Sequence, residues 1–304
     1  MRDGILLVDK PGGPTSADVV RQIKRRFRVA AIGHVGTLDP MATGLLPLCL
    51  GAGTKIAQFL AADHKAYTGE IRLGLATDTL DVTGITVAEA EVPAFDDAAL
   101  ERVAADFLGP GEQRPPMYSA VKIAGRELYK LAREGVEVER SPRPVEIRAF
   151  RLEQVPGNPL AIRFAVDCSK GTYVRVLAAD VGAALGTLAT LASLRRTRFG
   201  AFDVAEARPL QELLDLPGIE DLPLIPSRAA LRGVREMPVD PPLAFAIASG
   251  QRTALREVSP PLDDERLLAL IAPNRELLAV LEADSGSWRL KRVLMPEAGQ
   301  LYRP

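Results

Sequence analysis

The chain has 304 residues, of which 47% are hydrophobic and 25% are charged, so it can bury a sizeable core and is neither disordered nor collagen-like. Its 38 Lys and Arg residues nearly balance its 39 Asp and Glu residues, which excludes a strongly basic, histone-like binder. The two cysteines, Cys49 and Cys168, are too few for a disulfide framework and favour buried free thiols.

No apolar run approaches the roughly 18 residues that a membrane span requires. The apolar run at residues 5–8 is too short for a secretory signal, and no small-residue cleavage site follows it. We therefore expect a soluble, cytoplasmic protein without membrane contact.

The first predicted helix covers residues 16–27, with Ser16 as its N-cap and an apolar face of Val19, Val20, Ile23 and Phe27. Alternating apolar residues predict a half-buried strand over 67–75. Asp97 is the expected cap of a second helix, whose apolar stripe is Leu100, Val103 and Phe107.

Residues 145–155 and 160–168 have the composition of two strands joined by a turn at residues 157–159. The spacing of apolar residues after Val174 predicts a helix that ends near Gly186. Turns separate some strands and helices separate others. This pattern favours the α+β class, with a mixed, largely antiparallel sheet rather than a strict βαβ series.

Seven prolines between residues 206 and 242 indicate a linker or domain boundary. Beyond them, short strand-like runs at 267–271, 277–282 and 288–294 predict a small β-barrel. The expected domains are therefore residues 1–235 and 236–304.

Charge is distributed unevenly along the chain. Residues 1–60 carry eight basic and four acidic residues, 76–113 carry one and nine, and 114–151 carry nine and five. A nearly neutral protein of this kind can still present a positive face to a polyanion, although solvated helix faces would give the same pattern.

The most unusual stretch is GHVGTLDPMATG at residues 33–44. Its glycines and Pro40 predict a rigid, irregular loop that brings His34 and Asp39 within reach of each other. Taken alone, Asp39 is better explained by a turn that it closes with its own backbone. In SKGTYVR at 169–175, Arg175 is placed to hold a carboxylate in its ionised form, or only to form a surface salt bridge.

Two further stretches are basic. Residues 114–129 interleave bases with aromatics, which suits contact with RNA bases and phosphates, and residues 195–198 form a short cluster. We find no paired metal-ligand spacing, nucleophile elbow, phosphate-binding glycine loop or dinucleotide fingerprint, so neither a metal nor a cofactor is expected.

Together, these stretches resemble the TruB family of tRNA pseudouridine synthases, which modify uridine 55 in the T loop. The resemblance runs in order over the first 200 residues and is carried by DKPGGPTS (9–16), GHVGTLDPMATG (33–44), KAY (65–67), PMYSAVK (116–122), SKGTYVR (169–175) and LRRT (194–197). It implies a catalytic domain of the pseudouridine synthase type, and more weakly a C-terminal RNA-binding domain of the PUA type.

The resemblance also implies roles for individual residues. Asp39 is the catalytic carboxylate, Arg175 its ion-pair partner, and Tyr67 stacks on the flipped uracil and helps to move a proton. The substrate-binding residues are His34, Tyr173 and Leu194, while Lys10 and Pro11 support the catalytic loop. Candidates for contact with the RNA backbone are Lys24, Arg25, Arg26, Arg114, Lys122, Arg126, Arg195 and Arg196.

The implied partner is the T stem-loop of tRNA, with no obligatory protein partner and a monomeric chain. Thr190 stands where family members usually have a histidine, which we interpret as a lost packing or RNA contact. Two alternatives remain: a guide-RNA-dependent relative that shares the Asp block, and a non-catalytic RNA-binding module or tRNA-folding chaperone.

Overall fold

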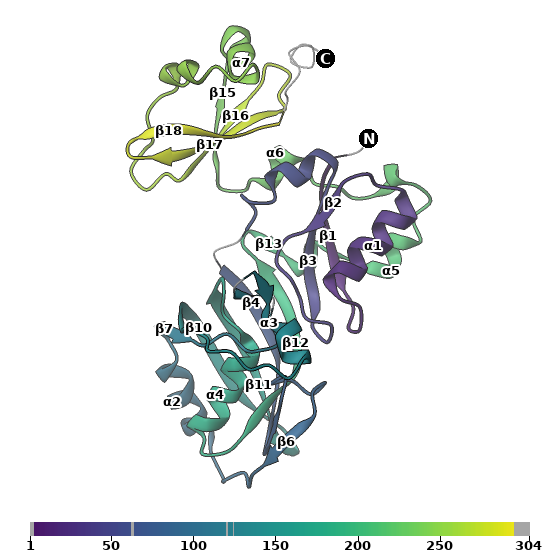
Figure 1. Ribbon diagram of the computed structural model, residues 1–304, viewed down its shortest axis with the longest axis vertical. Helices are drawn as coiled ribbons and strands as arrows, with labels where there is room; N and C mark the ends of the chain where they lie inside the picture. The colour runs from purple at the N-terminus through teal and green to yellow at the C-terminus, as the bar shows by residue number, and fades with distance from the viewer. Residues whose placement is uncertain (1–2, 62–63, 120, 124, 295–304) are drawn as a thin grey trace.

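The computed structural model describes residues 3–61, 64–119, 121–123 and 125–294. Its main body is a sheet with the strand order β14-β1-β3-β12-β4-β11-β10-β7, in which β2 also pairs with β3 and β13 with β12 (Figure 1). The strands are β1 (Gly4–Lys10), β2 (Ile32–His34), β3 (Thr43–Leu50), β4 (His64–Leu73), β7 (Gly109–Gln113), β10 (Arg143–Val155), β11 (Asn158–Ser169), β12 (Ala189–Phe199), β13 (Phe202–Asp203) and β14 (Arg208–Pro209). Of the described pairs in this sheet, β1–β14 and β3–β12 are parallel and the rest antiparallel, so the predicted mixed sheet is confirmed.

Four helices share one apolar cluster with this sheet. They are α1 (Ser16–Phe27), α2 (Asp97–Asp106), α4 (Val174–Ala184) and α5 (Leu210–Leu214). Ile23 of α1, Leu100 of α2 and Leu177 of α4 are at most 1% exposed and belong to the same cluster as Ile71 of β4. The helices therefore bury the sheet face on which their apolar stripes lie.

The N-cap residues of two helices differ from the predicted ones by one position. Thr15, not Ser16, caps α1, and it forms a capping box with Asp18. Asp96, not Asp97, caps α2 by accepting from the amide of Ala99. In both helices the neighbouring residue has the same capping chemistry, so the sequence did not distinguish the two positions.

A glycine lets β3 join β12 at the centre of the sheet. Gly44 has a φ of +95°, and a Cβ at this position would lie 2.3 Å from the carbonyl oxygen of Arg196. No other residue fits there without moving the backbone. This close approach places the loop before β3 beside the middle of β12.

Short elements lie outside the main sheet. The hairpin of β5 (Leu75–Thr77) and β6 (Thr86–Glu89) follows β4, and the pair β8 (Lys122–Ile123) and β9 (Arg126–Glu127) precedes α3 (Leu128–Arg133). The 3₁₀ helices are η1 (Gly51–Ile56), η2 (Val204–Glu206), η3 (Ile219–Asp221) and η4 (Arg252–Glu257).

The proline-rich region is not a plain linker. Within it, β14 extends the main sheet beside β1, and the backbone of Ile225 exchanges hydrogen bonds of 2.8 Å with Ile5. Helix α6 (Ser227–Ala230) follows and contacts β1. The first part of the proline-rich region therefore packs along β1 of the main body, before the chain continues into the C-terminal sheet.

The C-terminal part forms a separate four-stranded sheet at the top of Figure 1. Its strands, in order, are β15 (Arg235–Pro238), β16 (Leu267–Ile271), β17 (Leu277–Asp284) and β18 (Ser287–Val293), and α7 (Pro241–Ala248) packs on it. The described residues form an open sheet, so the predicted closed barrel is wrong for this part of the chain. No helix in the described ranges is both long and apolar enough to span a membrane.

Candidate active site

The loop that carries Asp39 is anchored by a buried arginine on the central strand β12. Arg196 is 0% exposed. Its Nη2 donates to the carbonyl of Gly36 at 2.8 Å, its Nη1 to that of Thr37 at 3.4 Å, and its Nε to that of Leu45 at 2.8 Å. The prediction that Arg196 contacts the RNA backbone is therefore wrong, because its guanidinium is enclosed and its donors hold the loop.

The residue before Asp39 is held by a serine from α1. The Oγ of Ser16, which is 1% exposed, accepts from the amide of Leu38 at 2.8 Å and donates to the carbonyl of Leu38 at 3.0 Å. Ser16 therefore joins α1 to the loop instead of capping the helix. Both polar backbone groups of Leu38 are satisfied, which a buried loop requires.

The residue after Asp39 is held by a lysine from the end of β1. Lys10 is 0% exposed, and its Nζ donates to the carbonyl of Pro40 at 3.1 Å and to those of Pro11 and Pro14, both at 2.8 Å. Burial lowers the pKa of Lys10 to about 8, although the Asp39 carboxylate opposes the shift. The loop is thus fixed on both sides of Asp39.

Arg175, the second residue of α4, holds the carboxylate itself. Its Nε lies 3.0 Å from Oδ2 of Asp39, and the side chain of Arg175 is only 6% exposed. Its two terminal nitrogens donate to the carbonyls of Thr79 at 2.9 Å and Tyr118 at 2.8 Å. The guanidinium therefore orients Asp39 from a fixed position, which its planar shape and multiple donors allow.

A second carboxylate faces the same arginine and was not predicted. Oδ2 of Asp81 lies 3.8 Å from Nη1 of Arg175, and Asp81 is 4% exposed. Its Oδ1 accepts from the hydroxyl of Thr79 and the amide of Thr83, both at 3.0 Å. In the sequence Asp81 is one of nine acids between residues 76 and 113, and no pattern separates it from the others.

Thr190 supports the Asp81 loop from inside the core. It is 0% exposed, and its Oγ1 lies 3.0 Å from Oγ1 of Thr77, which also donates to the carbonyl of Asp81 at 2.7 Å. Thr190 is thus enclosed, so it makes a packing contact and is not available to RNA.

The environment of Asp39 shifts its titration. Burial raises the pKa of Asp39 above its ordinary value of 3.8 and the charge of Asp81 raises it further, whereas Arg175 lowers it. The side chain remains 38% exposed, so one side of the carboxylate is open to a substrate. Arg175 therefore orients the carboxylate from the buried side, and the opposite side of the carboxylate is exposed to solvent.

Tyr67 lies on β4 opposite Arg196 of β12 and is 7% exposed. Burial raises the pKa of its phenol, although the charge of Arg196 and a hydrogen bond with that guanidinium oppose the rise. The phenol consequently stays protonated at neutral pH and keeps a proton to donate.

The three predicted substrate-binding residues come from three different parts of the fold. Leu194 lies on β12 with 8% exposure, and Tyr173 precedes α4, where its amide donates to Oε1 of Gln113 at 2.9 Å. His34 ends β2. Burial lowers the pKa of its imidazole, and its buried Nδ1 has no hydrogen-bond partner among the described residues.

The other residues predicted to contact the RNA backbone differ in whether their side chains are already bound to other groups of the protein. Lys24, Arg25 and Arg114 are exposed, whereas Arg26 donates to the carbonyl of Leu214 at 2.9 Å. Arg126 pairs with Glu134 at 2.6 Å and Arg195 with Asp9 at 2.6 Å. The side chain of Lys122 lies outside the described part of the structure. The exposed members remain predictions.

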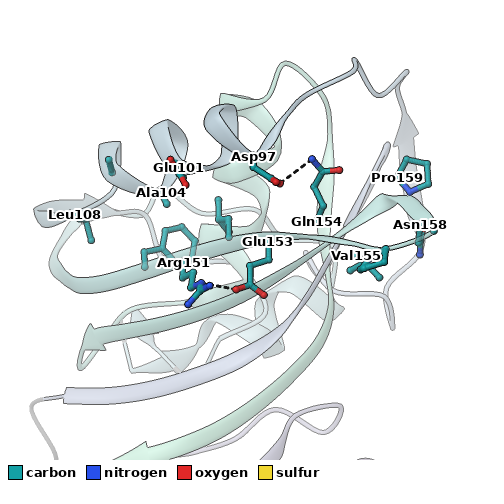
Figure 2. Close-up of a pocket in the computed structure, with 15 residues that line it drawn as sticks. Asp97, Glu101, Ala104, Leu108, Arg151, Glu153, Gln154, Val155, Asn158 and Pro159 are labelled. Atoms are coloured by element: carbon teal, nitrogen blue, oxygen red, sulfur yellow. Dashed lines mark hydrogen bonds and ion pairs between the residues drawn. The ribbon is translucent and has the colours of Figure 1, made fainter.

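A cavity of about 1010 Å³ lies elsewhere, between α2 and the β10–β11 hairpin (Figure 2). Its polar groups bind one another: Gln154 donates to Asp97 at 3.1 Å, and Arg151 lies 2.6 Å from Glu153. None of the predicted site residues lines it. The candidate site is therefore the surface around Asp39 and not this cavity.

Comparison with known proteins agrees with this geometry. The family model described as the N-terminal domain of TruB family pseudouridylate synthases matches residues 24–174, and the C-terminal domain model of tRNA pseudouridylate synthase B matches residues 175–222. This chain belongs to the TruB family. A tRNA pseudouridine synthase B from Azoarcus sp. is 43% identical over 299 residues, covering 98% of this chain and 97% of the relative.

Other TruB relatives match over shorter stretches. A tRNA pseudouridine synthase B from Psychrobacter cryohalolentis is 49% identical over 219 residues, which cover 70% of this chain and 60% of that protein. Among solved structures, a chain of a Cbf5–Nop10–Gar1 complex covers 96% of this chain with a TM-score of 0.71 at 24% identity. At that identity the likeness concerns the fold alone.

For this TruB chain, we expect Arg196→Met to reduce the free energy of unfolding by about 3 kcal/mol, because it leaves two loop carbonyls and the carbonyl of Leu45 in β3 without their donor. Chemical denaturation measures this loss. The matched control is Arg195→Met on the same strand, whose partly exposed pair with Asp9 should contribute about 1 kcal/mol or less. Equal losses in the two variants would contradict the anchoring role of Arg196.

Proposed function

We propose that this chain converts uridine 55 in the T loop of tRNA to pseudouridine, with Asp39 as the catalytic carboxylate and Arg175 and Tyr67 as its partners. The observation that carries this proposal is the ion pair of 3.0 Å between the half-exposed Asp39 and the buried Arg175. The names of the TruB relatives give the substrate as tRNA and the product as pseudouridine.

The reaction breaks the bond from C1′ to N1 of uracil, turns the base, and joins C1′ to C5. C5 then loses its proton to water and N1 takes one up, so the product is an isomer of the substrate. Asp39 serves this rearrangement as nucleophile or base, and both roles need its ionised form. Because the reacting atoms are inaccessible in a stacked nucleotide, the base must first be flipped out of the RNA. The open side of Asp39 receives it, with Tyr67 and Leu194 as apolar walls.

We expect Tyr67→Phe to bind RNA within about three-fold of wild type and to turn over about 10²-fold more slowly, because it keeps the ring and loses the proton donor. Tritium release from C5 and filter binding measure the two quantities. A wild-type rate would restrict Tyr67 to stacking on the uracil.

The phosphate-facing surface of the main domain comprises the exposed cations Lys24, Arg25 and Arg114. The division into residues 1–235 and 236–304 is part of the proposal, with the second part an RNA-binding domain of the PUA type. Several of its cations are already paired, such as Arg235 with Glu265 and Arg289 with Glu282, both at 2.7 Å. These paired cations are less available to phosphates than the exposed cations of the main domain.

The decisive assay is tritium release by the purified chain alone from an unmodified T-arm RNA tritiated at C5 of uridine. Turnover without added protein or guide RNA supports a stand-alone enzyme, which we propose to be monomeric and cytoplasmic, and separates it from the guide-dependent alternative. Binding without turnover would instead identify an RNA-binding module or chaperone.

A further inference from the structure

Lys65 is a partly buried lysine close to the site that none of the proposed roles uses. It lies two residues before Tyr67 on β4, so the two side chains leave the strand on the same face. Its Nζ lies 5.5 Å from the ring centroid of Phe199, the residue opposite it on β12. Within the described part of the chain, Lys65 has neither a carboxylate partner nor a hydrogen-bond acceptor.

The surroundings of Lys65 are positively charged. Burial lowers the pKa of Lys65, and the charges of Arg196 and Lys170 lower it further. The thiol of Cys168, which neighbours Lys65 on β11, gives no compensating charge at neutral pH, because burial raises its pKa to about 11. The ammonium group of Lys65 is thus partly desolvated and repelled by neighbouring positive charges. This arrangement lowers the stability of the folded protein unless an anion binds beside Lys65.

The position of the ring of Phe199 connects Lys65 with the catalytic loop. The ring packs so closely on Gly36 that a Cβ at that glycine would lie 2.3 Å from it. The ammonium of Lys65 therefore lies over a ring that packs against the loop. The backbone of Lys65 lies two positions from Tyr67, on which the target base is proposed to stack. A nucleotide stacked there brings its own phosphates within reach of a lysine side chain.

We propose that Lys65 binds a phosphate of the substrate RNA next to the target uridine. This inference rests on the proposed function and adds a phosphate-binding residue that is absent from the sequence-based candidates. The phosphate supplies the missing counter-charge, and the ion pair fixes the backbone while the base is held against Tyr67.

The first test measures RNA affinity in the Asp39→Asn background, so that the RNA is not converted during the measurement. Lys65→Met should weaken binding of the T-arm about ten-fold and lower the slope of log affinity against log salt by about 0.7, the share of one phosphate contact. Lys65→Arg should stay within about three-fold. The control Arg102→Met, an exposed cation on α2, should change neither quantity.

The second test identifies the phosphate. T-arm RNAs are made with a single uncharged methylphosphonate at each position flanking the target uridine. At one of these positions, the methylphosphonate should weaken RNA binding by the protein that retains Lys65. The same RNA should bind to Lys65→Met as tightly as unmodified RNA does. Unchanged affinity and salt slope in Lys65→Met, or losses that add at every position, would overturn the inference.

Thermal unfolding separates this role from a structural one. Because the folded state disfavours the charge of Lys65, Lys65→Met should melt at the same or a higher temperature than its parent, whereas a structural lysine would give a lower one. Tritium release by the wild type reports separately on the proposed function. If the wild type converts the RNA and Lys65→Met binds it normally, only the role of Lys65 fails.

Discussion

Asp39→Asn should lower the single-turnover rate of tritium release by about 10⁴-fold or more, because the amide can be neither nucleophile nor base. Binding of the T-arm should stay within about three-fold, since the substitution preserves shape and removes a negative charge that faces a polyanion. Rapid quench with RNA tritiated at C5 measures the rate, and filter binding measures the affinity.

The matched control is Asp97→Asn, which removes an exposed carboxylate from the first turn of α2, and should leave the rate unchanged. Retention of full turnover in Asp39→Asn would refute the mechanism even though the chain belongs to the TruB family. A lost rate together with lost binding would point to a disturbed loop instead of missing chemistry.

Arg175→Lys should reduce the rate at neutral pH by about 10²- to 10³-fold, although it conserves the charge. A lysine has no planar fork, so it cannot at the same time reach Asp39 and donate to the carbonyls of Thr79 and Tyr118. The expected loss lies in the rate at saturating RNA, because Arg175 is buried behind Asp39 and does not face the substrate.

The pH dependence distinguishes this role from a general loosening of the fold. Arg175 lowers the pKa of Asp39, while burial and Asp81 raise it. Weakening the pair therefore raises the pKa of Asp39, and the acid limb of the rate profile should move to higher pH in Arg175→Lys than in the wild type. The wild-type limb should itself lie above the ordinary value of 3.8. An unshifted limb would show that Arg175 does not control the ionisation of Asp39.

The sequence predicted the ion pair of Asp39 and Arg175 but not the residues that hold it in place. The loop at residues 33–44 and Arg175 were both recognised, and the structure brings Asp39 and Arg175 to 3.0 Å. Asp81 was missed because its partner, Arg175, is 94 positions away in the sequence. Nothing in the local sequence distinguishes Asp81 from the other acidic residues around it. Such long-range pairing depends on tertiary packing, which local periodicity does not contain.

Arg196 was misassigned although the sequence held a relevant signal. Adjacent residues of a strand point to opposite faces, so Arg195 and Arg196 cannot both face solvent when one face of the sheet is buried. Treating LRRT at residues 194–197 as a surface cluster ignored this alternation. The structure pairs Arg195 with Asp9 at the surface and turns Arg196 towards the Asp39 loop.

The small C-terminal domain shows a second limit of the sequence pattern. Three short apolar runs were correctly placed in strands, but the fourth strand, β15, comes from the proline-rich region and pairs in parallel with β16. The number and spacing of strands did not determine whether the sheet closes, because closure depends on tilt and register.

A crystal structure of the Asp39→Asn protein bound to an unmodified T-arm RNA tests the proposed mechanism directly. We expect uridine 55 to be flipped out, with its uracil stacked on Tyr67 and its C1′ within about 3.5 Å of the residue 39 side chain. A complex in which the target base stays stacked in the T loop, or binds away from residues 39 and 175, would contradict the mechanism.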